Sequence, residues 1–191
     1  MTTNPWLVPI TTLRRSIGSR REEHRAGRVG ELRVADSVVT ANDTVEADAM
    51  LDSVDGGVEV TATVSAPWAG QCRRCLKPVS GRLEANVREM YRPRRPGEAP
   101  EDDEETYPLS GELLDLQPLV RDAILLELPI APLCRDDCAG LCPTCGADLN
   151  DGPCSCPPPM GDQRWAALDA LREGGAGARA GATGADPAGS A

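Results

Sequence analysis

Residues 45–64, with the sequence VEADAMLDSVDGGVEVTATV, decide the fold of this 191-residue chain. Apolar residues occupy every second position on each side of a central Asp55-Gly56-Gly57 step. Such alternation is typical of strands that bury one face, and an Asp-Gly step supplies the positive φ of a tight turn. The stretch therefore predicts a β-hairpin.

The segments on both sides of this hairpin extend it. Residues 83–91 alternate in the same way, and residues 109–116 have the character of a strand that returns to the sheet. Residues 32–91 therefore predict an antiparallel β meander. Residues 1–30 begin with a short apolar stretch and continue with many arginines and several glycines, so we expect a strand and then a mobile Arg-rich segment.

Two helices are expected nearer the C-terminus. Residues 117–128 have apolar side chains at helical spacing, and Pro118 suits the first turn of a helix. Residues 162–172 predict a second helix, which Asp162 would cap and whose apolar stripe includes Trp165. The predicted fold class is therefore α+β: an antiparallel β meander with two helices and a C-terminal Cys-rich zinc module.

The same patterns divide the chain into four segments. The N-terminal strand and Arg-rich segment occupy residues 1–30, and the meander occupies residues 31–133, including an acidic loop at 92–106 and the first helix. Residues 134–172 form the Cys-rich zinc module and the terminal helix. Residues 173–191 are rich in Gly and Ala and contain no large apolar residue, so we expect a disordered tail.

The charge balance limits the partners that the chain can attract. With 20 basic and 30 acidic residues the formal net charge is −10, which argues against attraction of nucleic acid over the whole surface. Most arginines fall within two stretches, so they either decorate solvated faces or form a local surface for an anionic partner. The candidate residues of that surface are Arg14, Arg15, Arg20, Arg21, Arg73, Arg74, Arg92, Arg94 and Arg95.

The expected cellular location follows from the lack of long apolar stretches. The N-terminus has no apolar run of signal-peptide length, and no window approaches the 18 or so apolar residues of a membrane span. We therefore expect a cytoplasmic protein without a membrane partner. In that reducing compartment the cysteines are not expected to pair as disulfides.

The eight cysteines carry the strongest chemical signal. Two lie in the CRRC motif at residues 72–75, and six lie within residues 134–156. The most specific motif is CPTCG at residues 142–146, because two thiolates separated by two residues can bind one metal ion and the following Gly allows the tight turn. The CRRC motif has the same ligand spacing without the Gly. Together the motifs predict one or two structural Zn²⁺ sites.

Eight thiolates suit two closed sites of four ligands each. Iron is the alternative metal, and an interleaved arrangement, in which the CRRC pair joins the CPTCG pair, stays open from spacing alone. Bound metal would stabilise a core that is poor in aromatic side chains. The favoured arrangement assigns Cys142, Cys145, Cys154 and Cys156 to one zinc ion, and Cys72, Cys75, Cys134 and Cys138 to the other.

Catalysis is not predicted. His24 is the only histidine and lies in a charged segment, and closed thiolate sites leave no position for a small-molecule substrate. A thiol oxidoreductase that uses CRRC is an alternative. It is disfavoured because the residues after CRRC indicate a turn between strands, whereas a redox motif belongs at the junction of a strand and a helix.

Four stretches resemble the YceD family, the large ribosomal RNA subunit accumulation proteins. They are CRRCLKPV (72–79), LLDLQPLVRDAILLELPIAPLC (113–134), CRDDCAGLCPTCGADLN (134–150) and the CSC at 154–156. The resemblance covers roughly residues 5–172. It implies a bacterial or organellar factor for the accumulation of large-subunit ribosomal RNA, with no established catalytic activity and with a metal module that supports the fold.

The resemblance also implies the partner, which is either the large-subunit ribosomal RNA precursor or a basic ribosomal protein. The two arginine clusters would serve the RNA, and the acidic residues 98–105 would serve the protein. The alternative function is a zinc-ribbon nucleic-acid-binding module in transcription or RNA processing. It is disfavoured because the charges around residues 134–156 are mostly acidic.

Overall fold

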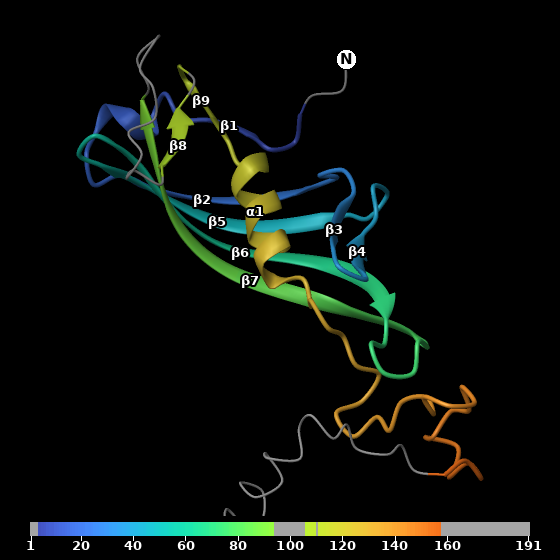
Figure 1. Ribbon diagram of the computed structural model, residues 1–191. Coiled ribbons are helices and arrows are strands. Elements are labelled where there is room, and N and C mark those ends of the chain that lie inside the picture. Colours follow the sequence, from blue (N-terminus) through green and yellow to red (C-terminus); the bar gives the residue numbers. More distant parts are fainter. Residues whose placement is uncertain (1–3, 94–105, 110, 158–191) are drawn as a thin grey trace, which may run out of the picture. The chain divides into compact units, whose positions relative to one another are not determined.

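The computed structural model describes residues 4–93, 106–109 and 111–157 (Figure 1). These residues form two compact units, one that ends at Leu141 and one that begins at Cys142. The first unit contains the helix and strands described below. In the part of the chain that is described, no helix is long and apolar enough to cross a membrane.

A seven-stranded sheet dominates the first unit. Strand β6 pairs with β5 along one part of its length and with β4 near its far end, and β7 lies along its other edge. All pairings in this sheet are antiparallel except that of β7 with β8. The strands are β2 (Arg20–Gly27), β3 (Leu32–Val34), β4 (Ser37–Val39), β5 (Val45–Val54), β6 (Gly57–Gln71), β7 (Pro78–Pro93) and β8 (Thr106–Leu109).

Two hairpins build the centre of the sheet. The predicted hairpin is confirmed, because β5 and β6 pair from Glu46↔Ser65 to Val54↔Gly57 and Gly56 has a φ of +79° in the turn. Strands β6 and β7 form a longer hairpin that runs from Val58↔Tyr91 to Gln71↔Pro78. Its turn, residues 72–77, therefore carries the CRRC motif to one end of the sheet (Figure 1).

The core lies on one face of this sheet. Alternate residues of β5 and β6, such as Leu51 and Val60, are buried in one cluster with residues of helix α1 (Gln117–Glu127) and with Trp6. The ribbon of β1 (Leu7–Pro9) and β9 (Leu113–Asp115) contributes further buried side chains to the same core. The aliphatic core expected from the composition is thus supplemented by one buried indole.

Local chemistry fixes both ends of α1. The Asp115 side chain accepts a hydrogen bond from the backbone N–H of Gln117 (2.9 Å), and Pro118 follows in the first turn. The helix ends where Leu128 becomes extended, with a ψ of 127°, because the following residue is Pro129. The buried face of the helix packs on β7, β6 and β3.

The predicted fold class is wrong. In the described residues the chain is mostly antiparallel β-sheet with the single α-helix α1 and a short 3₁₀ helix, η1 (Leu13–Arg15), and is not an α+β fold with two helices. The predicted helix at 162–172 lies outside the described residues, as does the predicted tail at 173–191. The domain boundaries drawn from the sequence stay a prediction.

The sheet also includes segments that the sequence did not mark as strands. Residues 20–27, expected to be mobile, form β2 and pair with β5 at all eight positions. This strand has charged side chains on both faces, so the apolar and polar alternation that reveals a strand is missing. Most of the acidic loop lies outside the described residues, but its last residue, Thr106, begins β8. Residues 113–115 return to β1 in a separate ribbon.

Two candidate metal centres

The first candidate centre is a cluster of four cysteine sulfurs at the end of the β6–β7 hairpin. Cys72 and Cys75 come from the turn, and Cys134 and Cys138 come from the segment that follows α1. All four sulfurs lie within 4.8 Å of one another, with 3.8 Å between Cys72 and Cys138 and 3.6 Å between Cys75 and Cys134. The cluster therefore joins two stretches that are about sixty residues apart in the chain.

Backbone hydrogen bonds hold the first two sulfurs in a tight turn. The N–H of Cys72 donates to the carbonyl of Lys77 (2.8 Å), and the N–H of Leu76 donates to the carbonyl of Cys72 (2.9 Å). Leu76 has a φ of +60°, in the left-handed region that residues with a side chain rarely adopt. The turn is thus held in shape by its own backbone, at the cost of some strain at Leu76.

A second set of hydrogen bonds joins this turn to the segment after α1. The N–H of Arg73 donates to the carbonyl of Pro132 (2.9 Å), and the carbonyl of Arg74 accepts the N–H of Leu141 (3.1 Å). The guanidinium of Arg74 donates to the carbonyl of Cys138 (2.9 Å). Three of the four cysteines are buried in a small apolar cluster with Val79, Leu133 and Leu141.

The second candidate centre belongs to the second unit. The sulfurs of Cys142, Cys145, Cys154 and Cys156 also lie within 4.8 Å of one another. Here the cysteines are less protected, because Cys142 is buried, Cys154 and Cys156 are half-buried and Cys145 is exposed. The two clusters are the two sets of four favoured by spacing, and not the interleaved arrangement. That all eight cysteines are metal ligands stays a prediction.

The two clusters use the same backbone turn. The N–H of Cys142 donates to the carbonyl of Ala147 (2.8 Å), and the N–H of Gly146 donates to the carbonyl of Cys142 (2.9 Å). Gly146 has a φ of +73°, so it occupies the position that Leu76 occupies in the first turn. The missing Gly therefore does not prevent CRRC from forming the same turn as CPTCG. Nothing in the sequence of CRRC indicated this equivalence beyond the ligand spacing.

The first cluster favours ionisation of one thiol and opposes ionisation of its neighbours. Burial favours the neutral form of Cys72, but hydrogen bonds from the backbone N–H groups of Cys75, Cys134 and Arg74 outweigh burial and lower its pKa from 9.0 to about 6. The hydrogen bond with Cys138, together with burial, raises the pKa of Cys134 to about 12. Four thiolates at this spacing therefore need a cation among them.

The second cluster shows the same division. The backbone N–H groups of Cys145 and Thr144 lower the pKa of Cys142 to about 6. The side chain of Cys145, together with burial, raises the pKa of Cys156 to about 12. Four convergent sulfurs with backbone N–H groups directed at one of them form a donor set that fits a closed tetrahedral zinc site, and iron is the other metal that takes four thiolates. Both clusters can hold a metal ion.

The candidate anionic-partner arginines that the structure describes lie at several separate places in the fold. Several are engaged within the protein: Arg14 donates to the carbonyl of Gly111 (3.2 Å), Arg20 pairs with Asp52 (2.7 Å), and Arg21 pairs with Glu23. Arg20 and Arg21 also point to opposite faces of β2, because they are consecutive residues of a strand.

The remaining candidates lie at distant places in the fold. Arg73 and Arg74 are at the turn of the β6–β7 hairpin, whereas Arg92 is near the other end of β7. Arg15 and Arg73 are exposed and form no ion pair with another described residue. Arg94 and Arg95 lie outside the described residues. A role of these arginines in binding an anionic partner stays a prediction.

Comparison with known proteins identifies the family. The model of the family described as "Large ribosomal RNA subunit accumulation protein YceD" matches residues 60–172, a stretch that contains all eight cysteines and α1. The chain belongs to the YceD family. The resemblance stated from the motifs is thereby confirmed.

Relatives of this YceD chain come from bacteria and from plants. A protein of Mycobacterium tuberculosis, named only as uncharacterized, is 36% identical over 170 residues, which is 86% of this chain and 80% of the relative. A protein of Arabidopsis thaliana, named "Large ribosomal RNA subunit accumulation protein YCED homolog 1, chloroplastic", is 34% identical over 67 residues, which is 35% of this chain and 21% of the relative. No solved structure matches the chain.

Proposed function

We propose that this chain is a non-enzymatic factor that supports the accumulation of large-subunit ribosomal RNA during ribosome biogenesis. Membership of the YceD family carries the proposal, since the family and its plant members are named for this role. We place the protein in the cytoplasm. Its partner is either the large-subunit ribosomal RNA precursor or a basic ribosomal protein, and it takes no small-molecule substrate.

A structural role for the two clusters supports the non-enzymatic part of the proposal. We assign one zinc ion to each set of four cysteines. Four thiolates complete the tetrahedral coordination that zinc prefers, so no position is left for a substrate or a reactive water molecule. Without metal, the raised pKa values of Cys134 and Cys156 oppose ionisation of all four thiols in a cluster. The positive charge of zinc would allow all four to ionise.

The position of the first cluster gives that zinc its purpose. It lies where the long β6–β7 hairpin meets the segment after α1, and the backbone bonds of Arg73 and Arg74 already align the two stretches. Structural zinc binds with an apparent free energy on the order of 10 kcal/mol, which is comparable to the stability of a whole domain. The metal would therefore hold this end of the sheet to the segment that follows α1.

The zinc-ribbon alternative is not favoured by the second unit. In a nucleic-acid-binding ribbon the turns would present basic side chains to phosphate groups. Between Cys142 and Cys156 the charged residues are Asp148 and Asp151, and there is no Lys or Arg. Residues 142–156 would therefore repel a phosphate backbone.

Two measurements test the proposal. Depletion of the protein from its native cell is expected to lower the ratio of large-subunit to small-subunit ribosomal RNA, and the wild-type gene should restore that ratio. An unchanged ratio in depleted cells would refute the function. Purified protein is expected to contain about two zinc ions, as two closed four-ligand sites require. Absence of metal in folded protein whose eight thiols all react freely would refute the structural part.

A further inference from the structure

The sheet of the first unit has a second face that no described element covers. Residues that alternate with the buried positions of β5, β6 and β7, and with the half-buried positions of β2, point to this side, which we call the outer face. Along one row His24, Asp48, Thr63 and Asn86 lie on neighbouring strands. The side chains of His24 and Asp48 are 63% and 74% exposed, so the outer face is open to solvent.

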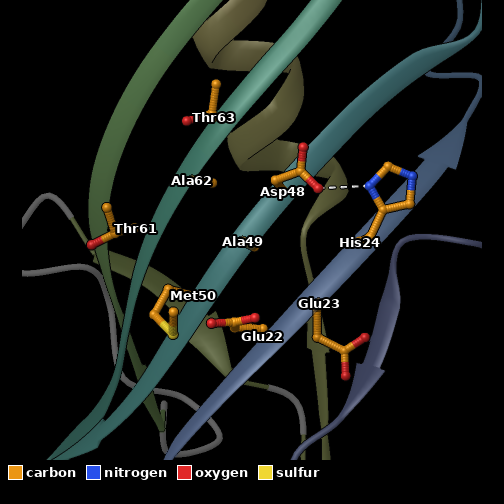
Figure 2. Close-up of a pocket in the computed structure, with 9 residues that line it drawn as sticks. All are labelled: Glu22, Glu23, His24, Asp48, Ala49, Met50, Thr61, Ala62 and Thr63. Carbon is orange, nitrogen blue, oxygen red and sulfur yellow. Dashed lines mark hydrogen bonds and ion pairs between the residues drawn. The ribbon is translucent and has the colours of Figure 1, made fainter.

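An open hollow of about 550 Å³ lies in the middle of the outer face. Figure 2 shows Glu22, Met50 and Thr61 around it, together with the hydrogen-bonded pair of His24 and Asp48. Met50 lies between Glu22 and Thr61 on the adjacent strands and is half-buried, whereas Glu22 and Asp48 are exposed. The hollow therefore has an apolar thioether at its base and carboxylates at its rim.

The rest of the outer face does not neutralise these carboxylates. Arg20 pairs with Asp52, Arg82 with Glu46 and Arg88 with Glu59, and Arg92, near the end of β7, is the fourth arginine that these strands direct to this face. On the same strands six carboxylates share this face, those of Glu22, Glu46, Asp48, Asp52, Glu59 and Glu84. The Nδ1 of His24 is 2.7 Å from Asp48. Among the described residues, Glu22 and Glu84 have no ion pair. Negative charge is therefore in excess around the hollow.

We propose that the outer face is a docking surface for an Arg- and Lys-rich segment of a protein partner, with one basic side chain inserted in the hollow. The aliphatic stem of an Arg or Lys would pack on Met50 while its charged head reaches the carboxylates of Glu22 and Asp48. Excess negative charge repels a phosphate backbone and attracts basic protein, so charge complementarity selects protein over RNA.

Of the two partners that the proposed function leaves open, the outer face favours the basic protein. Only the partner's place in ribosome biogenesis rests on the proposed function. Binding to the outer face uses none of the cysteines. If basic peptides do not bind the outer face, but depletion of the protein still lowers the ratio of large-subunit to small-subunit ribosomal RNA, only the docking surface is overturned. An unchanged ribosomal RNA ratio in depleted cells would instead overturn the proposed function.

The test uses the full chain and a short fluorescent peptide of alternating Arg and Gly, with binding followed by fluorescence anisotropy. The double variant Glu22→Gln/Asp48→Asn is expected to raise the Kd about tenfold, because it removes two ionic contacts at the rim of the hollow. The matched control Glu31→Gln/Glu112→Gln removes the same charge from exposed positions elsewhere. It is expected to change the Kd less than about twofold.

A second pair of variants tests the hollow itself. Thr61→Arg would place a tethered guanidinium beside Glu22 and block entry, whereas Thr44→Arg adds the same charge at an exposed position before β5. Only Thr61→Arg is expected to abolish peptide binding. Equal Kd values within either pair of variants would overturn the proposal. So would tighter binding of a fluorescent RNA oligonucleotide than of the peptide, or no peptide binding at low salt. Unchanged thermal unfolding of each variant excludes misfolding as the cause.

Discussion

Replacement of Cys138 by Ser gives the sharpest test of the first metal centre. Cys138 is buried, and its sulfur is 3.8 Å from that of Cys72, which lies 66 residues earlier in the chain. A cross-link that closes a loop of this length reduces the entropy of the unfolded chain and so stabilises the fold by about 4 kcal/mol, if metal acts as a covalent link does. We therefore expect Cys138→Ser to lower the free energy of unfolding of the first unit by about 4 kcal/mol.

The size of that loss makes it measurable by thermal unfolding. For a unit of this length about 4 kcal/mol corresponds to a fall in Tm of roughly 10 to 15 °C in the β-sheet signal of circular dichroism. Cys154→Ser is the control, because it disrupts the second centre and leaves the first unit intact. The same Tm for both variants, with unchanged zinc content in Cys138→Ser, would refute the assignment of the first centre as a structural cross-link.

Three further predictions concern single residues. Gly146→Leu is expected to weaken zinc binding by about 1 to 2 kcal/mol, because it places a side chain at positive φ. Leu76→Gly removes such a side chain from the first turn and should leave zinc binding unchanged or slightly stronger. Competition with a chelator measures both effects. Ser37→Ala should destabilise the protein by about 1 to 3 kcal/mol, because the buried Ser37 hydroxyl donates a hydrogen bond to the carbonyl of Pro129 (2.6 Å). Denaturant unfolding measures the change, and Ser80→Ala, at an exposed position, is the control that should have little effect. Burial raises the pKa of Tyr91 well above its ordinary 10.0, so the stability from the neutral phenol is complete below pH 10.0 and is lost as pH rises further. In Tyr91→Phe the fall in Tm above pH 10.0 should be smaller than in the wild type. An identical fall would show that ionisation of Tyr91 does not cause the loss of stability.

The elements that the sequence predicts correctly are those in which local chemistry and burial agree. The β5–β6 hairpin has both strict alternation and an Asp-Gly turn, and α1 has both Pro118 and an apolar stripe. The strand β2 lacks such agreement, since neither of its faces is apolar and its place is set by pairing with β5. Tertiary hydrogen bonding that the sequence does not display therefore decides the edge of the sheet.

The candidate site follows a similar division. Ligand type and spacing were enough to indicate the cysteines of both clusters, because a turn with two thiolates is a local structure. The partition between clusters was not determined by spacing, since it depends on where the β6–β7 hairpin brings residues 72–75. The hollow on the outer face could not be predicted from the sequence for the same reason, because Glu22, Asp48 and Met50 become neighbours only through the register of β2 and β5.

The equivalence of the two cysteine turns suggests why the first has a Leu at the strained position. Both turns have the same backbone hydrogen bonds, but the first is fixed on one side by the strands β6 and β7 and on another by the segment after α1. Surroundings that determine the backbone can maintain a left-handed residue at a cost of about 1 to 2 kcal/mol, which an isolated turn in a small unit is less able to bear. A turn that is supported by a sheet can therefore use Leu76, whereas the turn of the second unit, with fewer buried cysteines, depends on Gly146.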